Sequence, residues 1–266
     1  MSGYEKTVSE HYAKQAREVG LSPLSTTPDE VVREREIDAI IRYVALVDAA
    51  MARPLDLLEV GCGNGYTLGQ LRERFPTSTL QGVDYSPEMI AISRSRGVER
   101  ARFDVGDVRA LSCEPNAFDI VLSERCVINL LDREHQLSAL REIHRVVRPG
   151  GVCILIEGFE EGLDALNRAR AEFDLSPIPM PFHNLFFDEA WFKATIEDLF
   201  VEPAYADDTL PKANFLSSHY FMSRVVHAAL SRKDVRNSEF VRFFSFLPPV
   251  GNYASVQLRV LEKLGP

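Results

Sequence analysis

The sequence is poor in features that mark secreted, membrane-spanning and metal-binding proteins. Its 266 residues include four cysteines, and none of these forms a C-x-x-C pair or has His at zinc-ligand spacing. No run approaches the roughly 20 apolar residues of a membrane span, and the polar N-terminus lacks the apolar segment of a signal peptide. We therefore expect a cytoplasmic protein with reduced thiols, no metal site and no membrane contact.

Positive charge is also scarce. The chain has 30 Lys and Arg against 39 Asp and Glu, a formal net charge of −9, and its basic residues form no long run. Nucleic-acid binding needs a basic face, so the composition argues against a nucleic-acid partner. A local arginine pocket for an anionic small molecule is still compatible with this balance. Hydrophobic residues make up 45% of the chain, which suits one globular domain with additions.

Short apolar segments alternate with amphipathic ones in the first two thirds of the chain. An amphipathic helix is expected over 34–51. The pattern then predicts strands at 55–60, 79–83, 101–105, 118–123 and 152–157, with helices at 66–75, 87–95 and 133–147. This alternation is typical of an α/β fold with a doubly wound, mostly parallel sheet.

The remaining third has a looser pattern. It predicts helices at 162–173, 188–199 and 214–231, a tight turn at 148–151, and strands at 201–205 and 253–261. We divide the chain into an N-terminal helical arm (1–34), a core (35–157) and a remainder (158–266). The remainder completes the sheet and carries a helical lid at about 160–190 and 212–248.

The segment from Leu57 to Gly65 contains three glycines at alternate positions between a predicted strand and a predicted helix. Glycine lacks Cβ, so the backbone of such a turn can approach a ligand closely. The spacing is G-x-G-x-G, and Tyr66 stands where the dinucleotide fingerprint G-x-G-x-x-G has its last glycine. The turn therefore favours a nucleoside-bearing cofactor other than NAD.

Acidic residues follow the second and third predicted strands. Asp84 could accept hydrogen bonds from both ribose hydroxyls of a nucleoside, and Asp107 one from an adenine amino group. Tyr85 and Met89 could enclose the adenine ring. Together the two acids and the glycine turn predict a nucleoside site at the carboxyl edge of the sheet.

These elements together resemble the class I S-adenosylmethionine-dependent methyltransferases. The resemblance rests on residues 57–65, 82–86, 106–108, 118–121 and 140–151, and covers about 35–157. It implies a seven-stranded Rossmann-like sheet with an antiparallel last strand, and S-adenosylmethionine as cofactor with S-adenosylhomocysteine as product. The glycine turn would hold the methionine part, Asp84 the ribose and Asp107 the adenine. The predicted cofactor-binding residues are Glu59, Gly61, Gly63, Gly65, Asp84, Tyr85, Met89, Asp107, Val108 and Ser123.

The resemblance places the methyl acceptor above the strand ends, under a lid. Glu124, Arg125 and Asn129 follow the fourth strand, and Glu157 ends the fifth. On the predicted helix 214–231, Phe215, His219 and Met222 form a stripe, with Tyr220 and Arg224 beside it. The catalytic candidates are His183, His219 and Glu124. The substrate-binding candidates are Arg125, Asn129, Glu157, Tyr220 and Arg224.

The predicted activity is methylation of a small molecule, at oxygen, with a natural product or a sugar as acceptor. No Asn-Pro-Pro-Tyr follows the fourth strand, which argues against amino-methylation of nucleobases or glutamine. The alternatives are methylation at nitrogen or carbon, a cofactor-binding protein without turnover, and an NAD-dependent oxidoreductase. An oligomer is compatible with the sequence.

Overall fold

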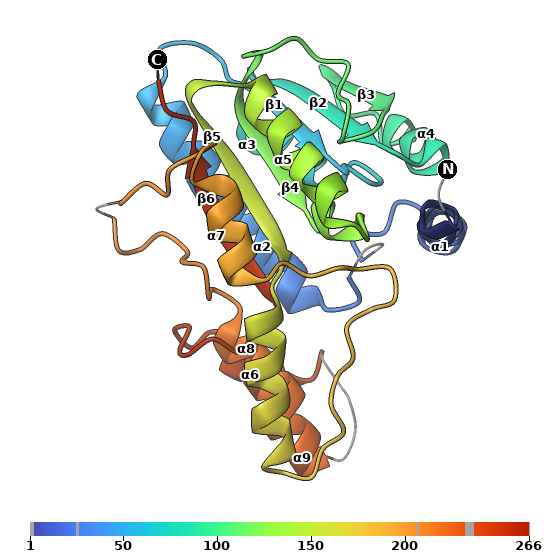
Figure 1. Cartoon of the computed structure of the whole chain (residues 1–266), viewed down its shortest axis with the longest axis vertical. Helices are drawn as coiled ribbons and strands as arrows, with labels where there is room; N and C mark the ends of the chain where they lie inside the picture. Colours follow the sequence, from blue (N-terminus) through green and yellow to red (C-terminus); the bar gives the residue numbers. More distant parts are fainter. Residues whose placement is uncertain (1–2, 25–26, 206, 232–236, 266) are drawn as a thin grey trace.

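A mixed six-stranded sheet forms the centre of the molecule in a computed structural model that describes residues 3–24, 27–205, 207–231 and 237–265 (Figure 1). The strand order is β3-β2-β1-β4-β5-β6, with β6 antiparallel to β5 and the other neighbours parallel. The sheet thus has the predicted doubly wound arrangement, with its order reversing between β1 and β4. The strands are β1 (Asp56–Val60), β2 (Thr79–Asp84), β3 (Ala101–Val105), β4 (Phe118–Glu124), β5 (Val147–Gly158) and β6 (Val256–Glu262).

Helices cover both faces of the sheet, which explains why its central strands are apolar without alternation. Side chains of α2 and α3 pack with Leu57 and Ile120 on one face. Those of α5 and α7 pack with Leu58 and Val121 on the other. The helices around the sheet are α2 (Glu30–Ala50), α3 (Tyr66–Arg74), α4 (Pro87–Ser95), α5 (Arg133–Val146) and α7 (Glu189–Ile196), with a single 3₁₀ turn η1 (Val127–Asn129) after β4.

The remaining helices lie outside the sheet. The N-terminal helix α1 (Gly3–Val19) packs beside α4, apart from the other helices in Figure 1. A group that we name the helical cap lies beyond the end of β5 (Figure 1). The cap consists of α6 (Glu160–Ala171), α8 (Ser217–Phe221), the π-helical turn η2 (Met222–Val226), α9 (His227–Ser231) and α10 (Glu239–Ser245).

The strand predicted at 201–205, the sixth of the seven expected, is wrong. In the part of the chain that the structure describes, Val201 alone pairs with Glu262 at the outer edge of β6, donating at 3.0 Å and accepting at 2.8 Å. Pro203 has no backbone N–H to continue the ladder. The segment therefore reduces to a single bridge.

Two other expectations differ from the structure. The predicted turn at 148–151 lies within β5, which begins at Val147, and it appears as an irregularity in the pairing with β4. Gly150 has a φ of +74°, which is how the strand accommodates the extra residues. The single helix predicted over 214–231 is a run of α8, η2 and α9, whose π-helical turn shifts the side chains after Phe221 around the helix axis.

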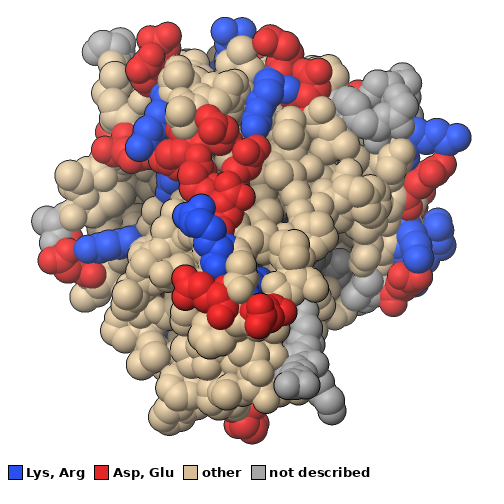
Figure 2. Space-filling model, turned by 60° about the horizontal axis from the view of Figure 1, so that its bottom comes forward, with Lys and Arg blue, Asp and Glu red and all other residues tan. Residues whose placement is uncertain are grey.

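The described helices include none long and apolar enough to cross a membrane. Figure 2 shows the face at the bottom of Figure 1, where Lys and Arg side chains are scattered among Asp and Glu. Among the residues that the structure describes, no group of three or more His, Cys, Asp or Glu could hold a metal ion.

Candidate active site

The glycine turn between β1 and α3 depends on the conformational freedom of its glycines. Gly61, Gly63 and Gly65 have φ values of +69°, +50° and +72°, a region that other residues rarely adopt. A Cβ on Gly61 would lie 2.6 Å from Sγ of Cys126, so the backbone there passes close to the segment after β4. The Gly61 N–H donates to the Val83 carbonyl at 2.7 Å and ties the turn to the end of β2.

A cavity of about 600 Å³ lies beyond the carboxyl ends of β1, β2 and β4. Open α/β sheets bind their ligands at this place, where the strand order reverses. The cavity wall includes most of the residues predicted from the sequence. These are Gly61, Gly63, Asp84, Tyr85, Met89, Asp107, Val108, Glu124, Arg125, Asn129, His183, Tyr220 and Arg224. The other predicted residues, described below, lie outside the wall: Glu59, Gly65, Ser123, Glu157 and His219.

Asp84 sits at the end of β2 with both carboxylate oxygens oriented by the backbone. Its Oδ2 accepts from the Gly63 N–H and its Oδ1 from the Ser86 N–H, each at 2.8 Å. Burial raises the pKa of Asp84 above its usual value, although the two backbone donors oppose the rise. The carboxylate is therefore held in a fixed orientation at the cavity wall.

Asp107 is held by an arginine that the sequence analysis did not identify. Arg109 binds its carboxylate in a fork, with Nη2 at 2.6 Å from Oδ2 and Nε at 3.0 Å from Oδ1. Nη1 of Arg109 lies 2.6 Å from a carboxylate oxygen of Glu5 on α1. Burial alone would raise the pKa of Asp107, but Arg109 lowers it overall. The chain Glu5–Arg109–Asp107 thus joins the N-terminal arm to the strand ends.

The arm also reaches the cavity through Tyr12, which lines its wall beside Asn129. Burial raises the pKa of the Tyr12 phenol. The neighbouring His11 stacks on His183, with ring centres 4.2 Å apart and an angle of 20° between planes. Burial, followed by the charge of His11, lowers the pKa of His183 to about 4, so its imidazole is neutral near pH 7.

A buried ionic network lies behind the end of β4. Arg33 of α2 donates to Glu124 and to Thr67, each at 2.9 Å, and Thr67 donates to the second oxygen of Glu124. Burial and then the charge of Glu124 raise the pKa of Glu59 well above its usual value. Glu59 belongs to this network, not to the cavity wall. Arg125, which has a left-handed φ of +51°, pairs with the fully buried Glu36 in the same region.

Gly65, Ser123 and Glu157 lie outside the cavity wall and have structural roles. Gly65 precedes α3 and packs against Phe103, which a Cβ would approach to 3.0 Å. Glu157 is fully buried and accepts a hydrogen bond from the Ser123 hydroxyl at 2.6 Å. It also accepts from the N–H groups of three consecutive residues after β4, Cys126, Val127 and Ile128. Glu157 therefore holds η1 in place from beneath.

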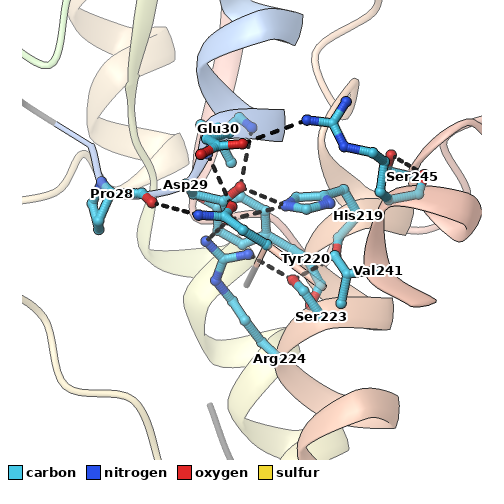
Figure 3. A network of polar contacts seen from close by, with 12 residues as sticks. Pro28, Asp29, Glu30, His219, Tyr220, Ser223, Arg224, Val241 and Ser245 are labelled. Carbon is cyan, nitrogen blue, oxygen red and sulfur yellow. Dashed lines mark hydrogen bonds and ion pairs between the residues drawn. The ribbon is translucent and has the colours of Figure 1, made fainter. Parts of the chain in front are cut away.

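His219 is paired with Asp29, the residue that precedes α2. Asp29 caps α2 by accepting from the Val32 N–H at 3.2 Å. Nε2 of His219 lies 3.0 and 3.1 Å from the two Asp29 oxygens, and Nη2 of Arg224 lies 3.0 Å from one of them (Figure 3). Burial lowers the pKa of His219, while Asp29 opposes the change. His219 therefore stabilises the N-cap of α2 and does not line the cavity.

The strand order, the glycine turn and the acids at successive strand ends are those of a class I methyltransferase fold. Residues 57–151 match the sequence model of the methyltransferase domain family. Residues 57–151 thus form a methyltransferase domain, and the fold of the chain is shared with a solved methyltransferase.

Relatives of known name share this domain with the chain. Norajmaline N-methyltransferase of Rauvolfia serpentina is 30% identical over 127 residues, which make up 46% of this chain and 42% of that protein. The chain thus spans less than half the length of this relative. The solved structure of a putative sarcosine dimethylglycine methyltransferase from Galdieria sulphuraria aligns over 97% of this chain and 98% of that protein's chain, with a TM-score of 0.58 and 14% identity. The [4+2]-cyclase SpnF aligns over 85% of this chain and 82% of its own, with a TM-score of 0.52 and 19% identity.

Proposed function

We propose that the protein transfers a methyl group from S-adenosylmethionine to a small-molecule acceptor. The observation that carries the proposal is the cavity itself. Its wall combines the glycine turn and Asp84 with polar and apolar side chains of the helical cap and the 178–186 segment. A volume of about 600 Å³ lies in the range of small-molecule sites.

The residues at the sheet end fit the cofactor that the family uses. The backbone of Gly61 and Gly63 would face the methionine part, because neither residue has a side chain in the way. Asp84 would accept hydrogen bonds from the two ribose hydroxyls. Val108 and Met89 offer apolar surface for the adenine, with Asp107 at its amino group. The bound cofactor supplies a methyl group already activated by the sulfonium charge.

The chain's own residues would mainly align the acceptor and exclude water. Of the three catalytic candidates, Glu124 is engaged by Arg33 and Thr67, and His219 lies outside the cavity. His183 lines the cavity and is neutral near pH 7, but a pKa of about 4 makes it a weak base. We infer that positioning, more than proton removal, governs turnover. The N-terminal arm and the helical cap would act as the lid over the acceptor.

Oxygen is the atom that we propose for methylation, on a natural-product or sugar acceptor. The name of the Rauvolfia relative makes nitrogen the second candidate. A screen of hydroxylated and amino acceptors with methyl-labelled donor decides between them. Formation of S-adenosylhomocysteine without transfer of the label to any acceptor would count against both.

Cofactor binding is tested by calorimetry with S-adenosylhomocysteine, with NAD as the comparison. Asp84→Ala should weaken binding more than tenfold, because charge-assisted hydrogen bonds contribute about 1.5–3 kcal/mol each. Asp104→Ala is the matched control, since Asp104 lies on β3 and pairs with Arg102 at 2.5 Å. Equal affinity of the Asp84 variant and the wild type would refute the ribose assignment. Preferential binding of NAD would refute the proposed function.

Binding of S-adenosylmethionine without any acceptor-dependent turnover would support the remaining alternative, a non-catalytic protein. The similarity of the fold to a [4+2]-cyclase makes this control necessary, because that protein's name describes a different reaction on the same fold.

A further inference from the structure

Arg224 is a buried cation on the wall of the cavity that the proposed reaction does not yet use. Its side chain is 8% exposed and lies on the π-helical turn η2 of the cap. The guanidinium carbon lies 3.6 Å from the centre of the Tyr220 ring, which lines the same wall. Such π-helical turns are rare and often occur at functional sites.

The guanidinium is held in one orientation by groups from two parts of the chain (Figure 3). Nη2 donates to Asp29 at 3.0 Å, and Nη1 donates to the Ser223 hydroxyl at 2.8 Å. Ser223 in turn donates to the His219 carbonyl at 2.7 Å. Within the described part of the chain, Asp29 and Ser223 account for two of its five N–H donors. Its flat face lies on Tyr220, so the plane of the guanidinium and its remaining three N–H donors are already oriented.

The acids on the cavity wall are all engaged by protein groups. Glu5 and Asp107 bind Arg109, Glu124 binds Arg33, and Asp84 accepts two backbone N–H groups. The charges of Glu5, Asp107 and Glu124 are thus balanced by arginines, and Asp84 is assigned to the ribose, so an acceptor ammonium would find no uncompensated carboxylate there. An acceptor with a negative group meets two guanidinium groups on the same wall, those of Arg224 and Arg125.

We infer that the acceptor carries a carboxylate, which docks against the Arg224 guanidinium. A guanidinium fork matches the planar carboxylate geometry, which a point charge such as Lys does not. The neighbouring wall includes Leu163, Ile178 and Phe186, so the rest of the acceptor would be apolar. This inference rests on the proposed function, because the carboxylate belongs to the molecule that receives the methyl group. Arg224 would then decide specificity, while Asp29 and Ser223 would be positioning residues.

The wild-type protein saturated with S-adenosylhomocysteine provides the first test. Its affinity for benzoate, phenylacetate and hexanoate is compared by calorimetry with its affinity for the three corresponding amides, which have the same shape without the charge. We expect at least one acid to bind ten or more times as tightly as its amide. Equal affinities for every pair, or no binding by any acid, would overturn the inference. Failure of S-adenosylhomocysteine itself to bind is a separate result and overturns the proposed function.

Variants then locate the preference. Arg224→Gln should remove the preference for the acid, and Arg224→Lys should weaken it because the fork is lost. Arg242→Gln is the control, since Arg242 belongs to the same cap but pairs with Glu30 and Glu34 on the surface. A preference that survives Arg224→Gln would assign the site to another residue. If Arg224→Gln does not fold, the comparison of acids with amides in the wild type and in Arg224→Lys decides.

Discussion

Replacing Asp29 separates the two functions of this residue, capping α2 and balancing the charge of Arg224. Asn is as good an N-cap as Asp, so Asp29→Asn keeps the bond to the Val32 N–H. It removes the charge and the second acceptor oxygen, Oδ2, which faces Arg224 and His219. Breaking a buried ion pair by removing one partner costs about 3–5 kcal/mol. Because Arg224 borders the cavity, we expect the lower end, about 3 kcal/mol. Asp29→Ala should cost about 1 kcal/mol more through the lost cap.

Urea unfolding measures both values from the shift of the midpoint at unchanged slope. Asp132→Asn is the matched control, because Asp132 caps α5 at an exposed position and should change stability by less than about 0.5 kcal/mol. The reasoning fails if Asp29→Asn is as stable as the wild type while Asp29→Ala loses only the value of a cap. Combining Asp29→Asn with Arg224→Gln should recover part of the loss, since the uncompensated cation is then gone.

Three further predictions concern the interior and the arm. Glu157→Ala leaves four hydrogen-bond donors without their acceptor and should destabilise the protein by at least about 3 kcal/mol in urea unfolding. A loss under about 1 kcal/mol would contradict the role of Glu157 beneath η1. The pKa values of His11 and His183 are lowered in the folded state, so the stability of their contact is full above pH 6.5 and declines as the pH falls from 6.5 toward 4. The protection of α1 amides against hydrogen exchange, relative to their intrinsic rate at each pH, should therefore fall at pH 5 in the wild type but not when both histidines are Asn. A protection that does not change with pH would refute this. Gly61→Ala should abolish binding of S-adenosylhomocysteine, because its Cβ would lie 2.6 Å from Cys126, and unchanged affinity by calorimetry would contradict the close approach.

The cofactor half of the fold was predictable because its signals are local. Periodicity and punctuation by Gly and Pro predicted α4 and β3 at their observed bounds, and Asp84 and Asp107 at strand ends. The same reasoning failed for 201–205, where an apolar-looking segment meets only the edge of β6. It also missed α10, which lies in a segment where no helix was predicted, and the π-helical turn, which does not change the apolar pattern that predicted a helix over 214–231.

The residues of the candidate site were likewise predictable only in part. Thirteen of the predicted residues line one cavity, since parallel strands bring their carboxyl ends to one edge of the sheet. Glu157 and His219 were assigned to ligands from their position alone, but each is occupied by protein partners. A buried polar residue satisfied by the chain itself cannot be distinguished, from sequence, from one that awaits a ligand.

The sequence by itself determined the order of strands and helices and the place of the glycine turn, because each depends on residues close together in the chain. Only the tertiary structure decided which charges meet. Arg109 reaches Glu5 across 104 positions, and Arg224 reaches Asp29 across 195. Such pairs form because a charge buried by the packing of distant segments needs a partner, whatever the separation in sequence. These long-range pairs place α1 and the helical cap against the cavity.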